Sequence, residues 1–172
     1  MQPNLPDMHS KLELVQKKII HQREDFAKTL AIWRFHEKKI VFTNGCFDII
    51  HRGHIEYLAK AAALGNYLVV GLNSDASVQR LKGKTRPVMD QESRALVLAS
   101  LQFVERVIIF PEDTPYDLIH FIRPNVLVKG GDYKPSEIVG YDIVKHSGGK
   151  VHSIEFVEGY STTSIIEKMK KQ

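Results

Sequence analysis

The feature that most constrains the fold is a regular alternation of short apolar runs with amphipathic segments from residue 39 onward. Apolar runs of strand length occur at 40–42, 67–72, 104–110, 126–129 and 151–156. Segments with helical spacing separate them at 52–64, 75–81, 91–101, 115–122, 141–147 and 162–170. Strands that alternate with helices build a parallel sheet through right-handed crossovers. We therefore predict a doubly wound α/β domain that binds its ligands at the carboxyl ends of the strands.

Residues 1–36 precede this alternation. Leu14, Ile19, Phe26, Leu30 and Trp33 recur there at roughly helical spacing among Lys, Gln and Glu. We predict an N-terminal extension of one or two amphipathic helices over 1–36, followed by a single domain over 37–172. A chain of 172 residues has the length of one ordinary domain.

Charge and cysteine content exclude several classes of protein. The chain has 24 Lys and Arg against 20 Asp and Glu, a net charge of +4, and its only tight cationic cluster lies at residues 168–171. A solvated helix end explains that cluster, so no nucleic-acid partner is expected. The single cysteine, Cys46, excludes an intramolecular disulfide and argues against a thiolate zinc site. No leader-like apolar segment and no run of 18 apolar residues occurs, so we expect a cytoplasmic protein without a membrane partner.

Two histidines, His51 and His54, stand three residues apart where the first predicted helix begins. At that spacing both imidazoles share one face, and the free N–H groups of the first turn favour an anion. Gly53 between them leaves room for close approach of a ligand. The pair could stabilise charge on a phosphoryl oxygen, whereas half a metal site or an ordinary pair of surface histidines are the alternatives.

The usual phosphate-binding fingerprints are absent. A P-loop ending at Gly83-Lys84-Thr85 requires a glycine where Val78 stands, and one ending at Gly149-Lys150 requires it at Val144. No G-x-G-x-x-G follows a predicted strand. The chain is therefore expected to handle phosphate without a kinase or dinucleotide-binding motif.

Two segments resemble the signatures of the cytidylyltransferase-like nucleotidyltransferases. The first runs from Asn44-Gly45-Cys46-Phe47-Asp48 into His51-Arg52-Gly53-His54, and the second is Gly159-Tyr160-Ser161-Thr162-Thr163-Ser164. The resemblance implies a Rossmann-like, three-layer α/β/α domain. Within this superfamily the chain most resembles the adenylyltransferases of ADP-heptose synthesis, over about residues 36–170. That likeness rests on residues 42–48, 72–77 with 81–84, 110–115 and 128–133.

The resemblance implies adenylyl transfer from ATP to D-glycero-β-D-manno-heptose 1-phosphate, giving ADP-heptose and pyrophosphate for lipopolysaccharide core synthesis. The attacking phosphate oxygen is already anionic, so alignment and charge neutralisation should suffice without a general base. Mg²⁺ is expected to accompany ATP. No compact carboxylate pair marks a seat for it, so we predict no metal ligands from the protein. The expected partners are these small-molecule substrates, and the superfamily also suggests a homodimer.

The site residues that the resemblance implies fall into three groups. The expected catalytic residues are His51, His54 and a mobile cation, Lys84. The expected nucleotide-binding residues are Asn44, Gly45, Cys46, Phe47, Gly53, Ser161, Thr162 and Thr163. The expected substrate-binding residues are Asp48, Gly131, Asp132 and Tyr133.

Each assignment has a plainer alternative. Lys84, like Lys82, is also explained as a solvated loop lysine, and the hydroxyls at 161–163 as simple helix capping. Asp48 could orient the histidine loop through side-chain to backbone bonds, or cap a helix. Residues 130–133 could be a turn. Arg94 is expected to face partly outward in an ion pair, so we leave it outside the site.

Other functions remain open on the sequence alone. A cytidylyltransferase acting on glycerol 3-phosphate or another small phosphate is the main alternative. Such enzymes usually carry an Arg shortly before the second signature, where this chain has Phe156-Val157-Glu158. A non-catalytic nucleotide sensor and a nucleic-acid-binding module are weaker alternatives. The intact histidines and hydroxyls argue against the sensor, and only the modest positive charge favours the nucleic-acid module.

Overall fold

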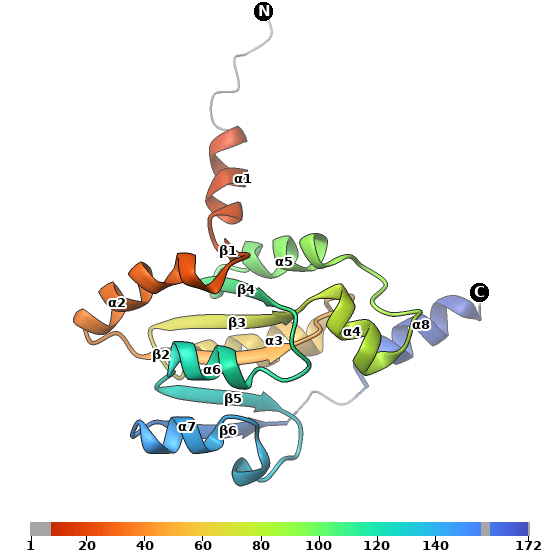
Figure 1. The fold of residues 1–172 in the computed structure, drawn as a ribbon. Helices are drawn as coiled ribbons and strands as arrows, with labels where there is room; N and C mark the ends of the chain where they lie inside the picture. Colours follow the sequence, from red (N-terminus) through yellow and green to blue (C-terminus); the bar gives the residue numbers. More distant parts are fainter. Residues whose placement is uncertain (1–7, 156–158, 172) are drawn as a thin grey trace, which may run out of the picture.

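The computed structural model describes residues 8–155 and 159–171 and shows one six-stranded parallel sheet in the strand order β1-β4-β3-β2-β5-β6 (Figure 1). The strands are β1 (Ile19–Ile20), β2 (Ile40–Gly45), β3 (Tyr67–Asn73), β4 (Arg106–Phe110), β5 (Val126–Gly130) and β6 (Lys150–Ile154). The α-helices are α1 (Met8–Gln16), α2 (Ala27–Phe35), α3 (Arg52–Ala62), α4 (Asp75–Lys82), α5 (Gln91–Ser100), α6 (Tyr116–Ile122), α7 (Tyr141–His146) and α8 (Thr162–Lys170). Two 3-10 helices, η1 (Arg23–Phe26) and η2 (Pro135–Glu137), complete the described elements.

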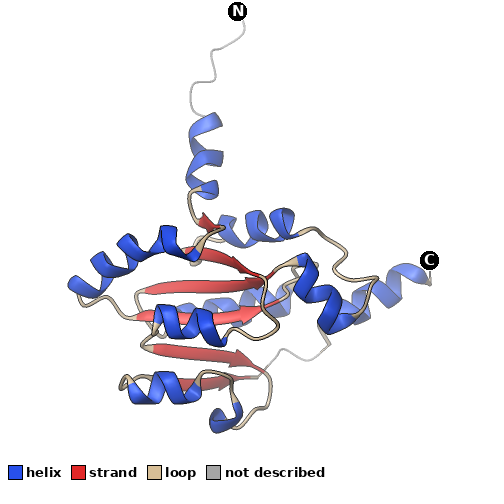
Figure 2. Ribbon diagram, in the orientation of Figure 1, coloured by secondary structure: helices blue, strands red, loops and turns tan. Residues whose placement is uncertain are grey.

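Helices cover both faces of the sheet, as Figure 2 shows. Alternation along β2 sends Phe42 into a core shared with α2, α6 and α7, and Val41 into a core shared with α3 and α5. Both clusters consist of buried aliphatic and aromatic side chains, which is the pattern of a parallel sheet covered on two sides. The predicted doubly wound, three-layer α/β fold is confirmed.

The N-terminal segment differs from the prediction in one respect. Ile19 and Ile20 form an edge strand instead of continuing a helix, and they pair with Val107 and Ile108 of β4. Two β-branched residues beside an open strand edge gain a backbone ladder that a helix would not offer. Farther along the segment, Trp33 is buried in the sheet core and stacks on Tyr67 with ring centroids 4.2 Å apart.

The predicted element boundaries hold to within a few residues, with small corrections. Helix α6 begins at Tyr116 with Pro115 as its N-cap, one residue later than the predicted start. Strand β6 ends at Ile154, and the predicted strand end at Phe156 lies outside the described residues. In the described part of the chain, no helix is both long and apolar enough to cross a membrane.

Candidate active site

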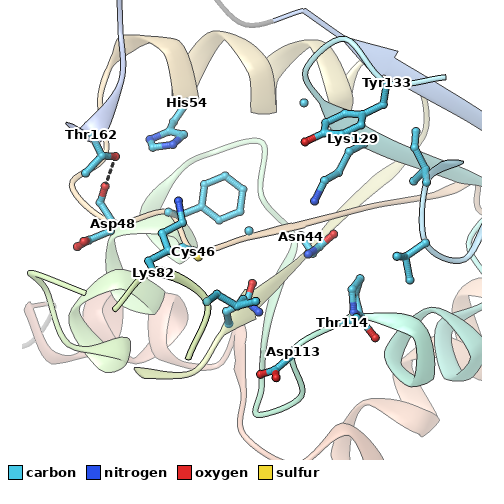
Figure 3. Close-up of a pocket in the computed structure, with 18 of the residues that line it drawn as sticks. Asn44, Cys46, Asp48, His54, Lys82, Asp113, Thr114, Lys129, Tyr133 and Thr162 are labelled. Atoms are coloured by element: carbon cyan, nitrogen blue, oxygen red, sulfur yellow. Dashed lines mark hydrogen bonds between the residues drawn. The ribbon is translucent and has the colours of Figure 1, made fainter. Parts of the chain in front are cut away.

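A cavity of about 550 Å³ opens at the carboxyl edge of the sheet, over the ends of β2, β3 and β5 (Figure 3). This is where ligands bind in doubly wound folds, because the strand order reverses between β2 and β5. Eight of the predicted site residues line it: Asn44, Gly45, Cys46, Phe47, Asp48, His54, Tyr133 and Thr162. The other predicted residues do not: His51, Gly53, Lys84, Gly131, Asp132, Ser161 and Thr163.

The two histidines meet at the start of α3. Their rings stack with centroids 3.9 Å apart, and Phe47 packs edge-on against His54 at 5.4 Å. His51 is the N-cap residue, and a Cβ on Gly53 would lie 3.1 Å from the His51 ring. Glycine at this position therefore lets the His51 ring lie against the first turn of the helix.

Both imidazoles are set up to bind an anion as neutral donors. Burial, reinforced by nearby His51 and Lys82, lowers the pKa of His54 to about 4, and burial also lowers the pKa of His51. Each ring therefore carries one N–H donor at neutral pH. The Nδ1 atoms of both rings are buried without a hydrogen-bond partner among the residues that the structure describes. Buried polar atoms are normally paired, so these two Nδ1 atoms are an unusual feature of the start of α3.

The second signature lies beside the histidine loop. Ser161 caps α8 in a reciprocal capping box with Ser164, and Thr162 donates its hydroxyl hydrogen to the Asp48 carbonyl at 2.7 Å (Figure 3). This bond brings the N-terminus of α8 to the edge of the cavity. Thr163 is exposed and Ser161 serves the capping box, so Thr162 is the hydroxyl that reaches the cavity lining.

Asp48 lines the cavity, but its carboxylate is engaged in holding protein segments together. Its carboxylate accepts hydrogen bonds from Arg86 Nε at 2.8 Å, Val88 N at 2.9 Å and Met89 N at 3.0 Å. Burial alone would raise the pKa of Asp48, but these three donors outweigh it and lower the pKa. The predicted side-chain to backbone bonds thus exist, but they reach residues 86–89 rather than the histidine loop.

The prediction that Arg94 faces partly outward is wrong. Arg94 is 0% exposed and donates to the Cys46 carbonyl at 2.6 Å, to the Asp75 carboxylate at 2.7 Å and to the Met89 carbonyl at 3.0 Å. The expected ion pair is present, with Asp75 at the start of α4, and a second guanidinium nitrogen of Arg94 is directed at the loop that follows β2. Sequence periodicity places Arg94 on α5, but it does not reveal that the guanidinium binds three separate segments of the chain.

The cations of the cavity also differ from the prediction. Lys84 is exposed and outside the lining, whereas Lys82, at the end of α4, lines the cavity and points toward His54 (Figure 3). Sequence reasoning missed Lys129, the residue before the last of β5, whose side chain also enters the cavity. Its position in a buried strand at the ligand-binding edge is the signal that could have found it.

The segment after β5 is ordered by β6. Ser153 donates to the Gly131 carbonyl and accepts from the Tyr133 backbone N–H at 3.3 Å. This arrangement leaves the Tyr133 side chain half-exposed at the rim of the cavity, and Asp132 is not among the lining residues. Of the three predicted sugar-binding residues of this segment, only Tyr133 is therefore near the cavity.

No cluster of three or more His, Cys, Asp or Glu residues able to hold a metal ion occurs in 8–155 or 159–171. The carboxylates that line the cavity include Asp48, which is taken up by Arg86, and Asp113, which pairs with Arg80 at 2.7 Å. The described residues thus offer no ready-made ligand set for a divalent cation.

A Rossmann-like sheet with paired histidines at a helix start and a hydroxyl-rich second helix start defines a nucleotide-binding transferase site. The family model described as cytidylyltransferase-like matches residues 42–168, and the chain belongs to this family of nucleotidyltransferases.

Individual relatives make the likeness more specific. The chain is 52% identical to the bifunctional protein HldE of Wolinella succinogenes over 94% of its own length and 33% of that protein. It is 62% identical to the protein of the same name from Campylobacter concisus over 78% of its own length and 28% of that protein. The chain thus spans about a third of the length of these curated relatives.

Solved structures show the same fold. A lipopolysaccharide core biosynthesis protein from Thermoplasma volcanium matches with a TM-score of 0.58 and 28% identity, covering 72% of this chain and 99% of that one. A pantoate-beta-alanine ligase from Francisella tularensis matches with a TM-score of 0.57 at 17% identity, covering 88% of this chain and 76% of that one. The second likeness concerns the fold alone.

Proposed function

We propose that this chain transfers the adenylyl group of ATP to D-glycero-β-D-manno-heptose 1-phosphate, releasing pyrophosphate and forming ADP-heptose. The observation that carries the proposal is the pair of neutral, unsatisfied imidazoles, His51 and His54, at the start of a helix beside the cavity. The relatives named HldE and the lipopolysaccharide core biosynthesis protein support the sugar phosphate as acceptor.

The reaction is a single in-line displacement. An oxygen of the sugar phosphate forms a bond to the α-phosphorus of ATP, and the bond from that phosphorus to the bridging oxygen breaks, so pyrophosphate leaves with the electron pair. A phosphate dianion needs no deprotonation, so the chain supplies alignment and charge stabilisation. His51 and His54 donate N–H hydrogen bonds to the phosphates, and the free backbone N–H groups at the α8 N-terminus, which Thr162 holds at the cavity, bind the outer ones.

Other residues position these groups. Arg94 fixes the Cys46 carbonyl, and Asp48 ties the histidine loop to residues 86–89, so both act through the backbone of the site. Mg²⁺ enters with ATP as part of the substrate and neutralises triphosphate charge. Water and phosphate oxygens supply its ligands, because no carboxylate set in the described residues offers itself.

The test is a panel of pyrophosphate-release assays with purified protein. ATP and CTP are each combined with D-glycero-β-D-manno-heptose 1-phosphate or glycerol 3-phosphate, and products are identified by mass spectrometry. We expect release only with ATP and the heptose phosphate. Turnover confined to CTP and glycerol 3-phosphate would replace the substrates while keeping the class of reaction, and no release with any pair would overturn the proposal.

A further inference from the structure

Lys129 is a charged residue in an otherwise apolar stretch of the sheet. Strand β5 reads Val126-Leu127-Val128-Lys129-Gly130, and its first three residues are fully buried. The Lys129 side chain is half-buried and directs its ammonium into the cavity (Figure 3). Partial burial of a charged ammonium costs free energy unless an anionic group pairs with it, so a lysine at this position indicates an anionic ligand.

The strand register places Lys129 next to Asn44. Phe42 of β2 pairs with Leu127 of β5, and Asn44 and Lys129 each follow two residues later on the same face of the sheet. Strand β3 lies on the other side of β2, and its last residue, Asn73, is on the same face of the sheet as Asn44. Asn73 also lines the cavity. Three neighbouring strands therefore end in a row of polar side chains on the α6–α7 side.

Nothing in the described part of the chain neutralises this ammonium. Burial lowers the pKa of Lys129, Cys46 opposes that effect, and the nearby charge of Lys82 lowers the pKa further. No hydrogen bond or ion pair engages either lysine among the described residues, whereas Arg86 is paired with Asp48 at 2.8 Å. The cavity therefore contains two cations that remain available to an anionic ligand.

Lys129 and His54 lie on different sides of the cavity. Figure 3 shows His54 and Thr162 near the α3 and α8 starts, and Lys129 across the space beside Asn44 and Tyr133. Lys82 points toward His54 and lines the same cavity as Lys129. A triphosphate held at the α3 and α8 starts would leave the Lys129 side for the second substrate.

We propose that Lys129 binds the phosphate of the acceptor sugar, together with Lys82, and so determines that the second substrate is a phosphate monoester. This assignment rests on the proposed function and adds a residue to it. Two anionic substrates repel each other as the nucleophile approaches the α-phosphorus. An ammonium on the acceptor side offsets that repulsion and points the phosphate oxygen at the α-phosphorus, while the bonds made and broken stay as described above.

The test compares Lys129→Met with wild type and with a control, Lys145→Met. Methionine keeps the length of the side chain and its apolar contacts while removing the charge, and Lys145 is an exposed lysine of α7 outside the cavity. Removing a charged hydrogen bond costs about 1.5–3 kcal/mol, so the KM for heptose 1-phosphate should rise about 10- to 150-fold. The KM for ATP should change less than about threefold, and Lys129→Arg should recover part of the loss.

Calorimetric titration of heptose 1-phosphate, without ATP, separates this assignment from the proposed function. We expect binding by wild type and Lys145→Met, and binding weakened by a similar factor in Lys129→Met. Wild-type protein that neither binds nor turns over the sugar phosphate would overturn the proposed function and this assignment with it. Wild-type turnover with unchanged acceptor affinity in Lys129→Met, or a selective rise in the KM for ATP, would overturn the assignment alone.

Discussion

The buried carboxylate of Asp48 is expected to anchor the segment that follows α4, and replacing it tests that role. Asp48 is 2% exposed and accepts three hydrogen bonds, one from the Arg86 guanidinium and two from the backbone of Val88 and Met89. Asp48→Asn keeps the shape of the side chain but removes its charge. The amide can no longer accept from all three donors and leaves Arg86 without its counter-ion.

The size of the effect follows from these contacts. Breaking a buried ion pair by removing one partner costs about 3–5 kcal/mol. The Arg86 side chain is 14% exposed, so water can partly solvate the orphaned guanidinium and the lower end applies. We therefore expect a loss of about 3 kcal/mol in the free energy of unfolding, which for a chain of this size corresponds to a fall of about 6–12 °C in Tm.

Urea unfolding of wild type, Asp48→Asn, Arg86→Met and the double variant measures this loss and the coupling between the two side chains. Glu24→Gln is the matched control, because Glu24 pairs with Arg23 at 3.2 Å with both side chains largely exposed. An exposed pair contributes about 0–1 kcal/mol. Because the Asp48 pKa is lowered in the folded protein, its contribution is present above about pH 4 and is lost as pH falls through the folded-state value. A loss for Asp48→Asn no larger than the control's would refute the reasoning.

Two further predictions concern the histidine pair. Gly53→Ala would place a Cβ 3.1 Å from the His51 ring and 3.2 Å from Tyr160 Cβ, and so displace the ring. The kcat for pyrophosphate release should then fall about 10- to 100-fold while Tm changes little. An unchanged kcat would show that the His51 ring tolerates displacement. The pKa of His54 is about 4 in the folded protein and about 6.5 in the unfolded chain, so between these values only the unfolded chain binds the extra proton. The free energy of unfolding therefore decreases as the pH is lowered from about 6.5 to about 4, by up to about 1.4 kcal/mol per pH unit. Denaturation at pH 7, 6 and 5 should show that His54→Gln loses part of this slope, and parallel curves for the two proteins would contradict the assigned pKa.

Much of the fold could be predicted because hydrophobic periodicity and helix capping are local. Ser74 and Asp90 cap α4 and α5 by accepting from the backbone three residues on, as such residues usually do. Strand β1 could not be found this way. Ile19 and Ile20 fit a helical period, and only the open edge of β4, more than 80 residues away, makes them a strand.

The site could be predicted only where chemistry is contiguous in the sequence. His51 and His54 lie three apart, so helical geometry alone brings their rings together. Arg94 and Lys129 were missed or misplaced because their roles come from long-range contacts. Arg94 reaches Cys46, 48 residues before it in sequence, and Lys129 enters the cavity through the pairing of β5 with β2. The contact of Arg94 leaves no pattern within one segment, whereas Lys129 leaves only the weak local signal of a lysine near the end of an apolar strand.

The same limit applies to Lys82 and Lys84, two lysines of one loop region. Sequence composition does not separate them, and the structure does, because α4 ends at Lys82 and directs that side chain toward His54. Lys84 follows Gly83, whose φ of 95° turns the chain away from the helix, and it lies outside the cavity lining. The end of a helix thus decides which cation faces the cavity.

The central claim is that the histidine pair stabilises adenylyl transfer to a sugar phosphate, and His54→Gln tests it most directly. Glutamine retains a donor but cannot place it where the imidazole N–H lies. With ATP and D-glycero-β-D-manno-heptose 1-phosphate, kcat for pyrophosphate release should fall about 10²- to 10³-fold, as on removal of a donor to a developing charge, while Tm stays near the wild-type value. A folded His54→Gln protein that releases pyrophosphate at the wild-type rate would contradict the account.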